Sequence, residues 1–380
     1  MKLELLGGIS PKKFLKDWWQ KKPLLIRQAV PGFKGLLNRD QLIDLACRDA
    51  VQSRLITQAN EKWKVKQGPF PPRAFSRLPK AQWTLLVQDV NHFIPSARDL
   101  LLRFNFIPYS RLDDLMVSYA PAGGGVGPHF DSYDVFLLQG MGRRQWQISA
   151  QQDKELVADA PLKILQDFRS EREWLLEPGD MLYLPPGYAH NGIAKDACMT
   201  YSIGFRAPSH QELATQFLVY LQDHSSVNGM YQDPHLKLQT HPGQISQAML
   251  RQAGAAIDKI KWGRVDVERF MGLYLTEPKP HVFFEPPSQP MGEQEFARRL
   301  ERDKLELDLK SRMLWKAKTF FLNGEFCSVG SPGRRLLEIL ADHHELRTAK
   351  PIDEEVLLLL YQWYLDGYVI FAADKEERSQ

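Results

Sequence analysis

Short runs in which apolar and polar residues alternate occupy much of residues 51–205. A period of two predicts strands with one buried face, and Pro-Gly pairs at 178–179 and 186–187 supply turns. Such strands, without long helices between them, predict an antiparallel sandwich or barrel. The predicted strands are VQSRLITQ (51–58), KWKVKQG (62–68), WTLLVQ (83–88), LMVSYA (115–120), YDVFLLQG (133–140), RRQWQIS (143–149), DMLYLP (180–185) and MTYSIGF (199–205). Ahead of them the pattern predicts helices over 12–20 and 40–47 and a strand over 24–27.

The pattern changes to helical spacing over residues 209–285. Ser209 is a predicted N-cap, and Glu212 three residues later would complete a capping box. Two further helical runs follow, around 245–260 and 265–277. Three helices alone bury their apolar faces poorly, so we expect them to pack on the first domain or on a second copy of the chain.

A Pro-rich stretch, 279–290, predicts a linker to a last zone over 291–380. That zone combines helical runs with two strand-like runs joined by Asn323-Gly324, the strongest short hairpin signal in the chain. Helices with a β-hairpin and a final helix–strand unit are typical of a winged helix. The predicted architecture is mixed α+β, with domains over 1–208, 209–285 and 291–380.

Composition narrows the class of protein. A net charge of +3 over 380 residues is too small to support direct nucleic-acid binding. No apolar run approaches the ~20 residues of a membrane helix, and the N-terminus lacks a signal-peptide core. The three cysteines are widely spaced and odd in number, which favours a reducing cytoplasm over disulfides or a zinc site.

The candidate chemistry lies in two short stretches, GGGVGPHFDSYDVFLLQG and LEPGDMLYLPPGYAHNG. They contain His129, Asp131 and His190. On a strand, residues two apart face the same side, so His129 and Asp131 can both point into a barrel. Two imidazoles and one carboxylate leave one face of a metal open, as in non-haem Fe(II) oxygenases. Zinc, manganese and nickel fit the same ligands. The alternative without a metal is that these are three hydrogen-bonded polar residues in turns.

Arg144 favours an oxoacid cosubstrate. Its guanidinium can meet a carboxylate through two parallel hydrogen bonds, and it begins the strand after the metal-binding strand. Arg143 and Arg144 point in opposite directions, so only one can face inward. Ser118 and Tyr201, on flanking strands, could add hydroxyl donors.

The stretches that contain these residues resemble those of a known family. The runs WWQKKPLLIR, DDLMVSYAPAGGGVGPHFDSYDVFLLQGMGRRQWQIS, LEPGDMLYLPPGYAHNG and YSIGFRAP are similar to JmjC-type 2-oxoglutarate oxygenases. More narrowly, the chain resembles the arginine-hydroxylating group of bacterial ribosomal oxygenases. The resemblance implies a double-stranded β-helix (the cupin/JmjC fold), a helical dimerisation region and a winged helix.

The resemblance also implies roles for single residues. His129, Asp131 and His190 would bind Fe(II), Arg144 would bind 2-oxoglutarate, and Ser118 would assist from the adjacent strand. The implied reaction consumes O₂, hydroxylates an arginine β-carbon of a large-subunit ribosomal protein, and releases succinate and CO₂. The implied partner is thus a ribosomal protein, with a homodimer formed through 209–285.

An arginine substrate needs anionic or aromatic neighbours. Tyr133 and Asp134 are candidates for contact with its guanidinium. Asp113 and Asp114 could serve either as substrate contacts or as structural residues. Three alternatives stay open: a histidine hydroxylase, an N-methyl demethylase with the same iron chemistry, and a non-enzymatic cupin-like binding protein.

Overall fold

The computed structural model describes residues 4–59, 62–330, 332–348 and 352–374, which form two compact units. The first unit comprises Met1–Ala207 together with Pro280–Glu285 and Asp308–Lys310, and the second comprises the rest. The Pro-rich stretch 279–290 is therefore not a simple linker, because residues 280–285 belong to the first unit. There His281 Nε2 lies 3.4 Å from Asp89 Oδ2. The predicted boundaries at 208, 285 and 291 stay predictions.

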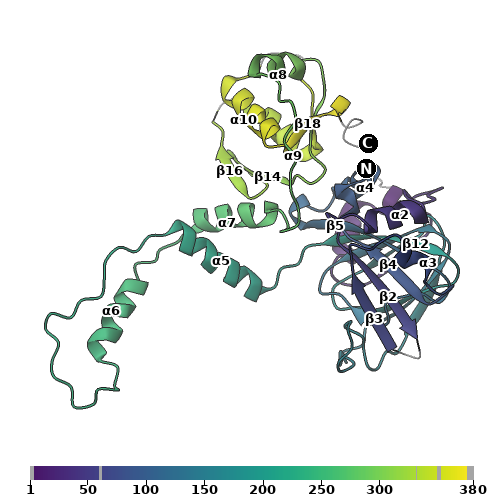
Figure 1. Cartoon of the computed structure of the whole chain (residues 1–380), viewed down its shortest axis with the longest axis horizontal. Coiled ribbons are helices and arrows are strands. Elements are labelled where there is room, and N and C mark those ends of the chain that lie inside the picture. Colours follow the sequence, from purple (N-terminus) through teal and green to yellow (C-terminus); the bar gives the residue numbers. More distant parts are fainter. Residues whose placement is uncertain (1–3, 60–61, 331, 349–351, 375–380) are drawn as a thin grey trace. The chain divides into compact units, whose positions relative to one another are not determined.

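The first unit contains two antiparallel sheets. The larger has eight strands in the order β1-β10-β7-β12-β5-β4-β2-β3, and the smaller has four in the order β6-β11-β8-β9. Several strands of the larger sheet lie together in Figure 1. The strand bounds are β1 Leu24–Ile26, β2 Ser53–Ala59, β3 Lys62–Gln67, β4 Trp83–Val87, β5 Leu112–Ala120, β6 His129–Phe130, β7 Val135–Met141, β8 Arg144–Ser149, β9 Arg172–Leu176, β10 Met181–Leu184, β11 Ala189–Ala194 and β12 Cys198–Phe205.

All eight strands expected from the alternation in 51–205 are confirmed, as is the strand at 24–27. Apolar residues between the two sheets form one core cluster, which includes Leu137, Trp146 and Leu182. A larger cluster joins the other face of the eight-stranded sheet to the N-terminal helices. The helices of this unit are η1 Glu4–Leu6, α1 Pro11–Asp17, α2 Arg39–Ala46, α3 Arg73–Ser76, η2 Val90–His92, α4 Pro95–Leu102 and η3 Tyr109–Arg111.

The second unit begins with α5 His210–His224, α6 Gln247–Ile257 and α7 Arg264–Thr276. Ser209 caps α5 by accepting from the Glu212 backbone N–H at 3.0 Å, as expected. The Glu212 carboxylate accepts a hydrogen bond from the Tyr274 hydroxyl on α7. The predicted capping interaction is thus present from the Ser209 side, while the Glu212 side chain ties two helices together.

The rest of the second unit has its own core around Phe296, Leu340 and Leu360. Asn323 and Gly324 have φ of 52° and 84°, and two positive φ values in a two-residue loop are what a type I′ hairpin needs. The remaining elements are α8 Glu293–Leu300, β13 Leu305–Leu307, β14 Met313–Lys316, β15 Thr319–Leu322, β16 Glu325–Ser328, α9 Arg334–His343, β17 Glu345–Leu346, α10 Glu354–Leu365, β18 Val369–Phe371 and η4 Ala372–Asp374. No helix among the described residues is both long and apolar enough to span a bilayer.

Candidate metal centre and cosubstrate pocket

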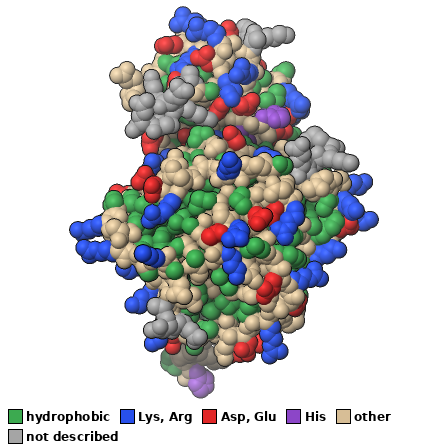
Figure 2. All heavy atoms as spheres, turned by 90° about the vertical axis from the view of Figure 1, so that its right-hand side faces the viewer, with side chains coloured by type: hydrophobic (Ala, Val, Ile, Leu, Met, Phe, Trp, Pro, Cys, Tyr) green, Lys and Arg blue, Asp and Glu red, His purple; other side chains and the backbone are tan. Residues whose placement is uncertain are grey.

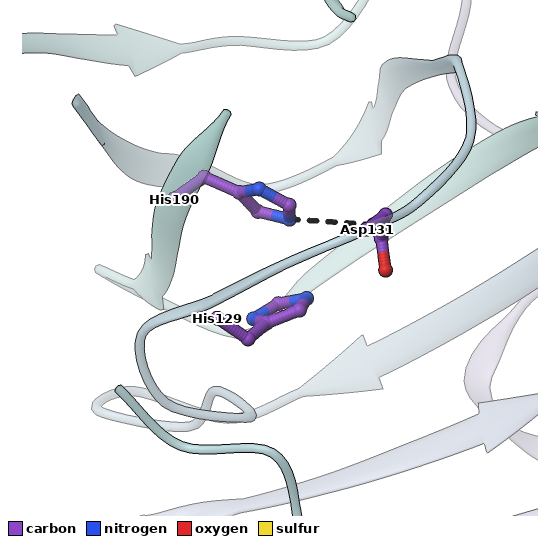
Figure 3. Close-up of side chains that lie close together, drawn as sticks. All are labelled: His129, Asp131 and His190. Carbon is purple, nitrogen blue, oxygen red and sulfur yellow. Dashed lines mark ion pairs between the residues drawn. The ribbon is translucent and has the colours of Figure 1, made fainter. Parts of the chain in front are cut away.

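Pairing of two short strands brings the candidate ligands together. His129 in β6 lies opposite His190 in β11, and Asp131 follows directly after β6. The possible ligand atoms of the three side chains all lie within 4.8 Å of one another. His190 Nε2 is 3.6 Å from an Asp131 carboxylate oxygen, and the two imidazole centroids are 4.2 Å apart. Figure 3 shows the three side chains converging on one point.

The main chain fixes the tautomer of both histidines. His129 Nδ1 lies 2.9 Å from the Gly127 carbonyl oxygen, and His190 Nδ1 lies 3.0 Å from the Tyr188 carbonyl oxygen. A carbonyl oxygen can only accept, so each Nδ1 carries the proton and donates it. Each Nε2 is left with its lone pair directed toward the cluster, which is the arrangement that a metal-binding imidazole requires.

His190 is held in its neutral form. Burial and the neighbouring His129 ring lower its pKa to about 4, although Asp131 opposes the shift. A neutral imidazole is the form that binds a metal, because the protonated ring has no free lone pair. The three side chains therefore suit a divalent cation at neutral pH.

A pocket of about 480 Å³ lies beside these residues, between the two sheets. Arg144 lines it and is only 4% exposed. Arg144, Trp146 and Ile148 face the same side of β8, and Ile148 is paired with His190. Four residues along an antiparallel strand span ~13 Å. Arg144 and the His190 partner Ile148 therefore stand at the two ends of the stretch of β8 that faces the pocket.

Two buried nitrogens of Arg144, Nε and Nη2, have no hydrogen-bond partner among the residues that the structure describes. Leaving a buried charged donor unsatisfied is costly, so an anionic group in the pocket that Arg144 lines would supply the missing acceptor. Gly192 makes room for the Trp146 ring beside the pocket, because a Cβ there would lie 2.6 Å from that ring. The pocket thus fits a dianion that is bound to a metal at one end and to Arg144 at the other.

The hydroxyl groups that line the pocket are partly those expected. Ser118 lines it, and its Oγ lies 3.5 Å from the Thr200 carbonyl oxygen. Tyr201 does not line it: its hydroxyl accepts hydrogen bonds from the backbone N–H groups of Leu36 and Leu37. Thr200, the residue paired with Ser118 across the strands, lines the pocket in its place. Alternation along β12 could have identified Thr200, because it places Thr200 and Tyr201 on opposite faces.

Of the two predicted substrate contacts, Tyr133 lines the pocket and Asp134 does not. Tyr133 lines the pocket and is 42% exposed, and its pKa is raised by burial and then by Asp131, so its phenol stays protonated. Asp134 does not line the pocket and is fully buried. Its carboxylate accepts from Tyr183 Oη at 2.6 Å, Gln20 Nε2 at 2.9 Å and Arg111 Nη2 at 3.2 Å. The expected contact of Asp134 with substrate is therefore wrong. Asp113 and Asp114 line the pocket instead.

Comparison with known proteins agrees with this geometry. The JmjC domain family matches residues 99–213, and the ROXA-like winged helix family matches residues 255–369. The chain is 34% identical over 366 residues to the ribosomal protein uL16 3-hydroxylase of Escherichia coli (strain K12), covering 94% of this chain and 96% of that protein. It is 39% identical over 259 residues to a probable ribosomal oxygenase of Haemophilus influenzae, covering 67% and 62% of the two chains.

A solved structure matches across both units. The E. coli ribosomal oxygenase YcfD, in complex with cobalt and 2-oxoglutarate, superposes with a TM-score of 0.81 at 31% identity. The match covers 96% of this chain and 98% of that one. Together with the cluster of His129, Asp131 and His190, these similarities confirm the resemblance seen in the sequence: the chain belongs to the JmjC-type ribosomal oxygenases.

Proposed function

We propose that this protein is an Fe(II)- and 2-oxoglutarate-dependent hydroxylase of an arginine side chain in a large-subunit ribosomal protein, the uL16 counterpart. One observation carries the proposal: the three-ligand cluster and the two unpartnered nitrogens of buried Arg144 line the same pocket. When bound, Fe(II) with 2-oxoglutarate and O₂ supplies the oxidising power for hydroxylation. Succinate and CO₂ are the coproducts.

The chain's own residues hold and orient these groups. His129, Asp131 and His190 would hold the metal on one face, so that three positions remain for other ligands. Arg144 would bind the far carboxylate of 2-oxoglutarate, with Ser118 and Thr200 hydroxyls beside it. Leu137, Trp146 and Val135 give this part of the pocket an apolar lining, which would limit the access of water.

The chemistry of the pocket also suits a cationic substrate side chain. Asp113 and Asp114 line it near Tyr133, whose phenol is protonated, and Asp114 Oδ2 also accepts from the Asp89 backbone N–H at 3.2 Å. A guanidinium can pair with a carboxylate and lie over an aromatic face. Arginine fits this lining better than the neutral imidazole of histidine. The similarity to the E. coli ribosomal protein uL16 3-hydroxylase supports uL16 as the substrate protein.

Mass spectrometry tests the proposal. The protein is incubated with Fe(II), 2-oxoglutarate and unmodified large-subunit ribosomal proteins, and tryptic peptides are then sequenced. We expect one added oxygen atom on one arginine of the uL16 counterpart, together with succinate. His129→Ala, which removes a ligand, should give neither product. Oxygen on a histidine would identify the histidine hydroxylase, loss of a methyl group with formaldehyde would identify the demethylase, and no succinate would leave only a binding protein.

We further propose that the chain acts in the cytoplasm as a homodimer formed through residues 209–285. Several large apolar side chains of this region are exposed, among them Leu218 at 66%, Ile257 at 65% and Val265 at 66%. Burying such side chains against a second copy would recover ~25 cal/mol for each Å² of apolar surface removed from water. Exposed apolar side chains of this size are a feature of interaction surfaces, which supports the proposal.

A further inference from the structure

A groove lined by cations lies on the outer face of the eight-stranded sheet. It has a volume of about 410 Å³, and Leu55 on β2 and Phe70, both nearly buried, contribute to its floor. Lys64 and Lys66 line it from β3, and Arg73 and Arg77 line it from α3 and the residue that follows. All four cations belong to exposed residues.

The groove is separate from the metal centre. Along β3 the lysines alternate with Trp63 and Val65, which face the other side. A Cβ added to Gly127, just before the metal ligands, would lie 3.0 Å from the Trp63 ring. Trp63 therefore faces the space between the sheets, and Lys64 and Lys66 project away from it.

The charge of the segment that forms the groove differs from that of the chain as a whole. Residues 62–88 contain six basic residues, Lys62, Lys64, Lys66, Arg73, Arg77 and Lys80, and no acidic one, whereas the whole chain has a net charge of +3. Within the described ranges, Lys64, Lys66, Arg73 and Arg77 form no ion pair. The face drawn in Figure 2 shows Lys and Arg interspersed with Asp and Glu. A net charge of this size does not reveal such a local field.

Protection of a sheet edge explains only part of this pattern. β3 is the last strand of the sheet, and lysines on edge strands prevent pairing with other chains. That role accounts for Lys64 and Lys66. It gives no reason for Arg73 and Arg77 to line the same groove from another element.

We infer that this groove binds the phosphate backbone of a nucleic acid. Lys64 and Lys66 lie ~6.8 Å apart along the strand, a spacing suited to successive charges on a flexible polyanion. Arginine forks bind phosphate oxygens in pairs, while lysines act as point charges. The groove aromatic, Phe70, is only 6% exposed and offers no surface for base stacking, so the binding should not depend on sequence.

An acidic peptide is the main competing occupant. A peptide that added to the edge of β3 would use main-chain hydrogen bonds in the plane of the sheet. Lys64 and Lys66 instead project from the face of the sheet, and Arg73 and Arg77 face the same groove from α3 and the residue after it, so a flexible backbone with one charge per nucleotide can contact all four. The charge pattern therefore favours a nucleic acid.

Salt-dependent binding of RNA to the full chain tests this inference, independently of the proposed activity. Fluorescence anisotropy is measured with a labelled, unstructured single-stranded RNA. Four phosphate contacts predict a slope of log K against log salt of about −2.8, which is an affinity loss of about 50-fold between ~50 and ~200 mM salt. The variant Lys64→Gln/Lys66→Gln should halve the slope, to a loss of about 7-fold, and Arg73→Gln/Arg77→Gln should do the same.

Lys12→Gln/Lys13→Gln is the matched control, because it removes two exposed cations of the same unit outside the groove. It should bind RNA like the wild type, and circular dichroism verifies that every variant is folded. The inference is overturned if the wild type does not bind, if the groove variants bind like the control, or if polyglutamate of equal charge competes as well as RNA does. None of these results depends on turnover of 2-oxoglutarate.

Discussion

Arg143 and Arg144 are neighbours in the chain with opposite surroundings. Arg143 is exposed and its guanidinium Nε pairs with Asp196 at 2.8 Å, whereas Arg144 is buried with two nitrogens unpartnered. The same substitution at the two positions can therefore separate the role of a guanidinium in the pocket from its role at the surface.

Arg144→Lys should raise the KM for 2-oxoglutarate about 10-fold or more while leaving kcat closer to wild type. Lysine keeps the charge but loses the paired hydrogen bonds, which are worth roughly 1.5–3 kcal/mol when one partner is charged. Succinate formation at varied 2-oxoglutarate measures both constants. Arg143→Lys is the control and should leave them unchanged. Equal effects at both positions would place the carboxylate anchor elsewhere.

The depressed pKa of His190 makes the stability of the metal-free protein depend on pH. The unfolded chain binds a proton at this histidine near pH 6.5, while the folded chain does so only near pH 4. The free energy of unfolding should therefore fall as the pH is lowered from about 6.5 to 4, because the unfolded state binds more protons in that window. Urea unfolding of chelator-treated protein at several pH values measures this dependence.

His190→Gln should flatten this pH dependence because it removes the titrating ring. His343→Gln, which changes an exposed histidine of the second unit, should leave it unaltered. A His190→Gln protein with the wild-type slope would assign the pH dependence to other groups.

At the level of single residues, the sequence predicted those pocket-lining side chains whose direction follows from alternation within one strand. Arg144 and Ser118 line the pocket as expected, because both lie inside regular strands. Asp134 was misplaced because it lies in the irregular stretch between β6 and β7, where counting by twos no longer applies. The carbonyl partners of His129 and His190 depend on backbone geometry that residue types do not reveal.

Among the elements, Asp134 acts as a junction. Its carboxylate joins Gln20 after α1, Arg111 at the end of η3 and Tyr183 on β10, all around the start of β7. It is 0% exposed, and Arg111 is its cationic partner. These contacts tie the N-terminal segment to the sheet that supports the pocket.

Asp134→Ala should lower the free energy of unfolding by ~3 kcal/mol, because it leaves Arg111 and the Tyr183 hydroxyl without their acceptor. Asp196→Ala removes the exposed pair with Arg143 and should cost less than ~1 kcal/mol. Chemical denaturation followed by tryptophan fluorescence measures both values. Similar losses for the two variants would contradict the role of Asp134 as a junction.

The elements themselves were largely predictable, since apolar periodicity reflects burial. In the first unit, the strands that the alternation did not indicate include β9 and β11. The burial of β9 is low along most of its length, as expected for the last strand of the smaller sheet. With both faces partly in water, such a strand needs no alternation of apolar residues.

For the whole molecule, the proposed dimer makes a prediction of its own. Leu218→Glu/Val265→Glu places two charges among the exposed apolar side chains of α5 and α7, where they would lose hydration in an interface. Sedimentation equilibrium should show twice the chain mass for the wild type and the mass of one chain for the variant. Leu156→Glu, at a 37% exposed leucine of the first unit, should remain a dimer.

The sequence could not reveal how distant segments join one unit. Residues 280–285 return to the first unit after the helices of the second, where His281 approaches Asp89. A Pro-rich stretch has the same composition whether it spans two domains or packs against one of them. Long-range contacts of this kind depend on the folded surface.

The carbonyl acceptors of His129 and His190 bear on how this centre tolerates change. Gly127 and Tyr188 contribute them through the main chain, so no point mutation can delete either acceptor. What sets their positions is the path of two loops, one of which bends at Gly127 with φ of 81°. Insertions or deletions next to β6 or β11 should therefore damage the centre more than most side-chain replacements nearby. Over evolutionary time, loop length would be held constant here while the surrounding residues drift.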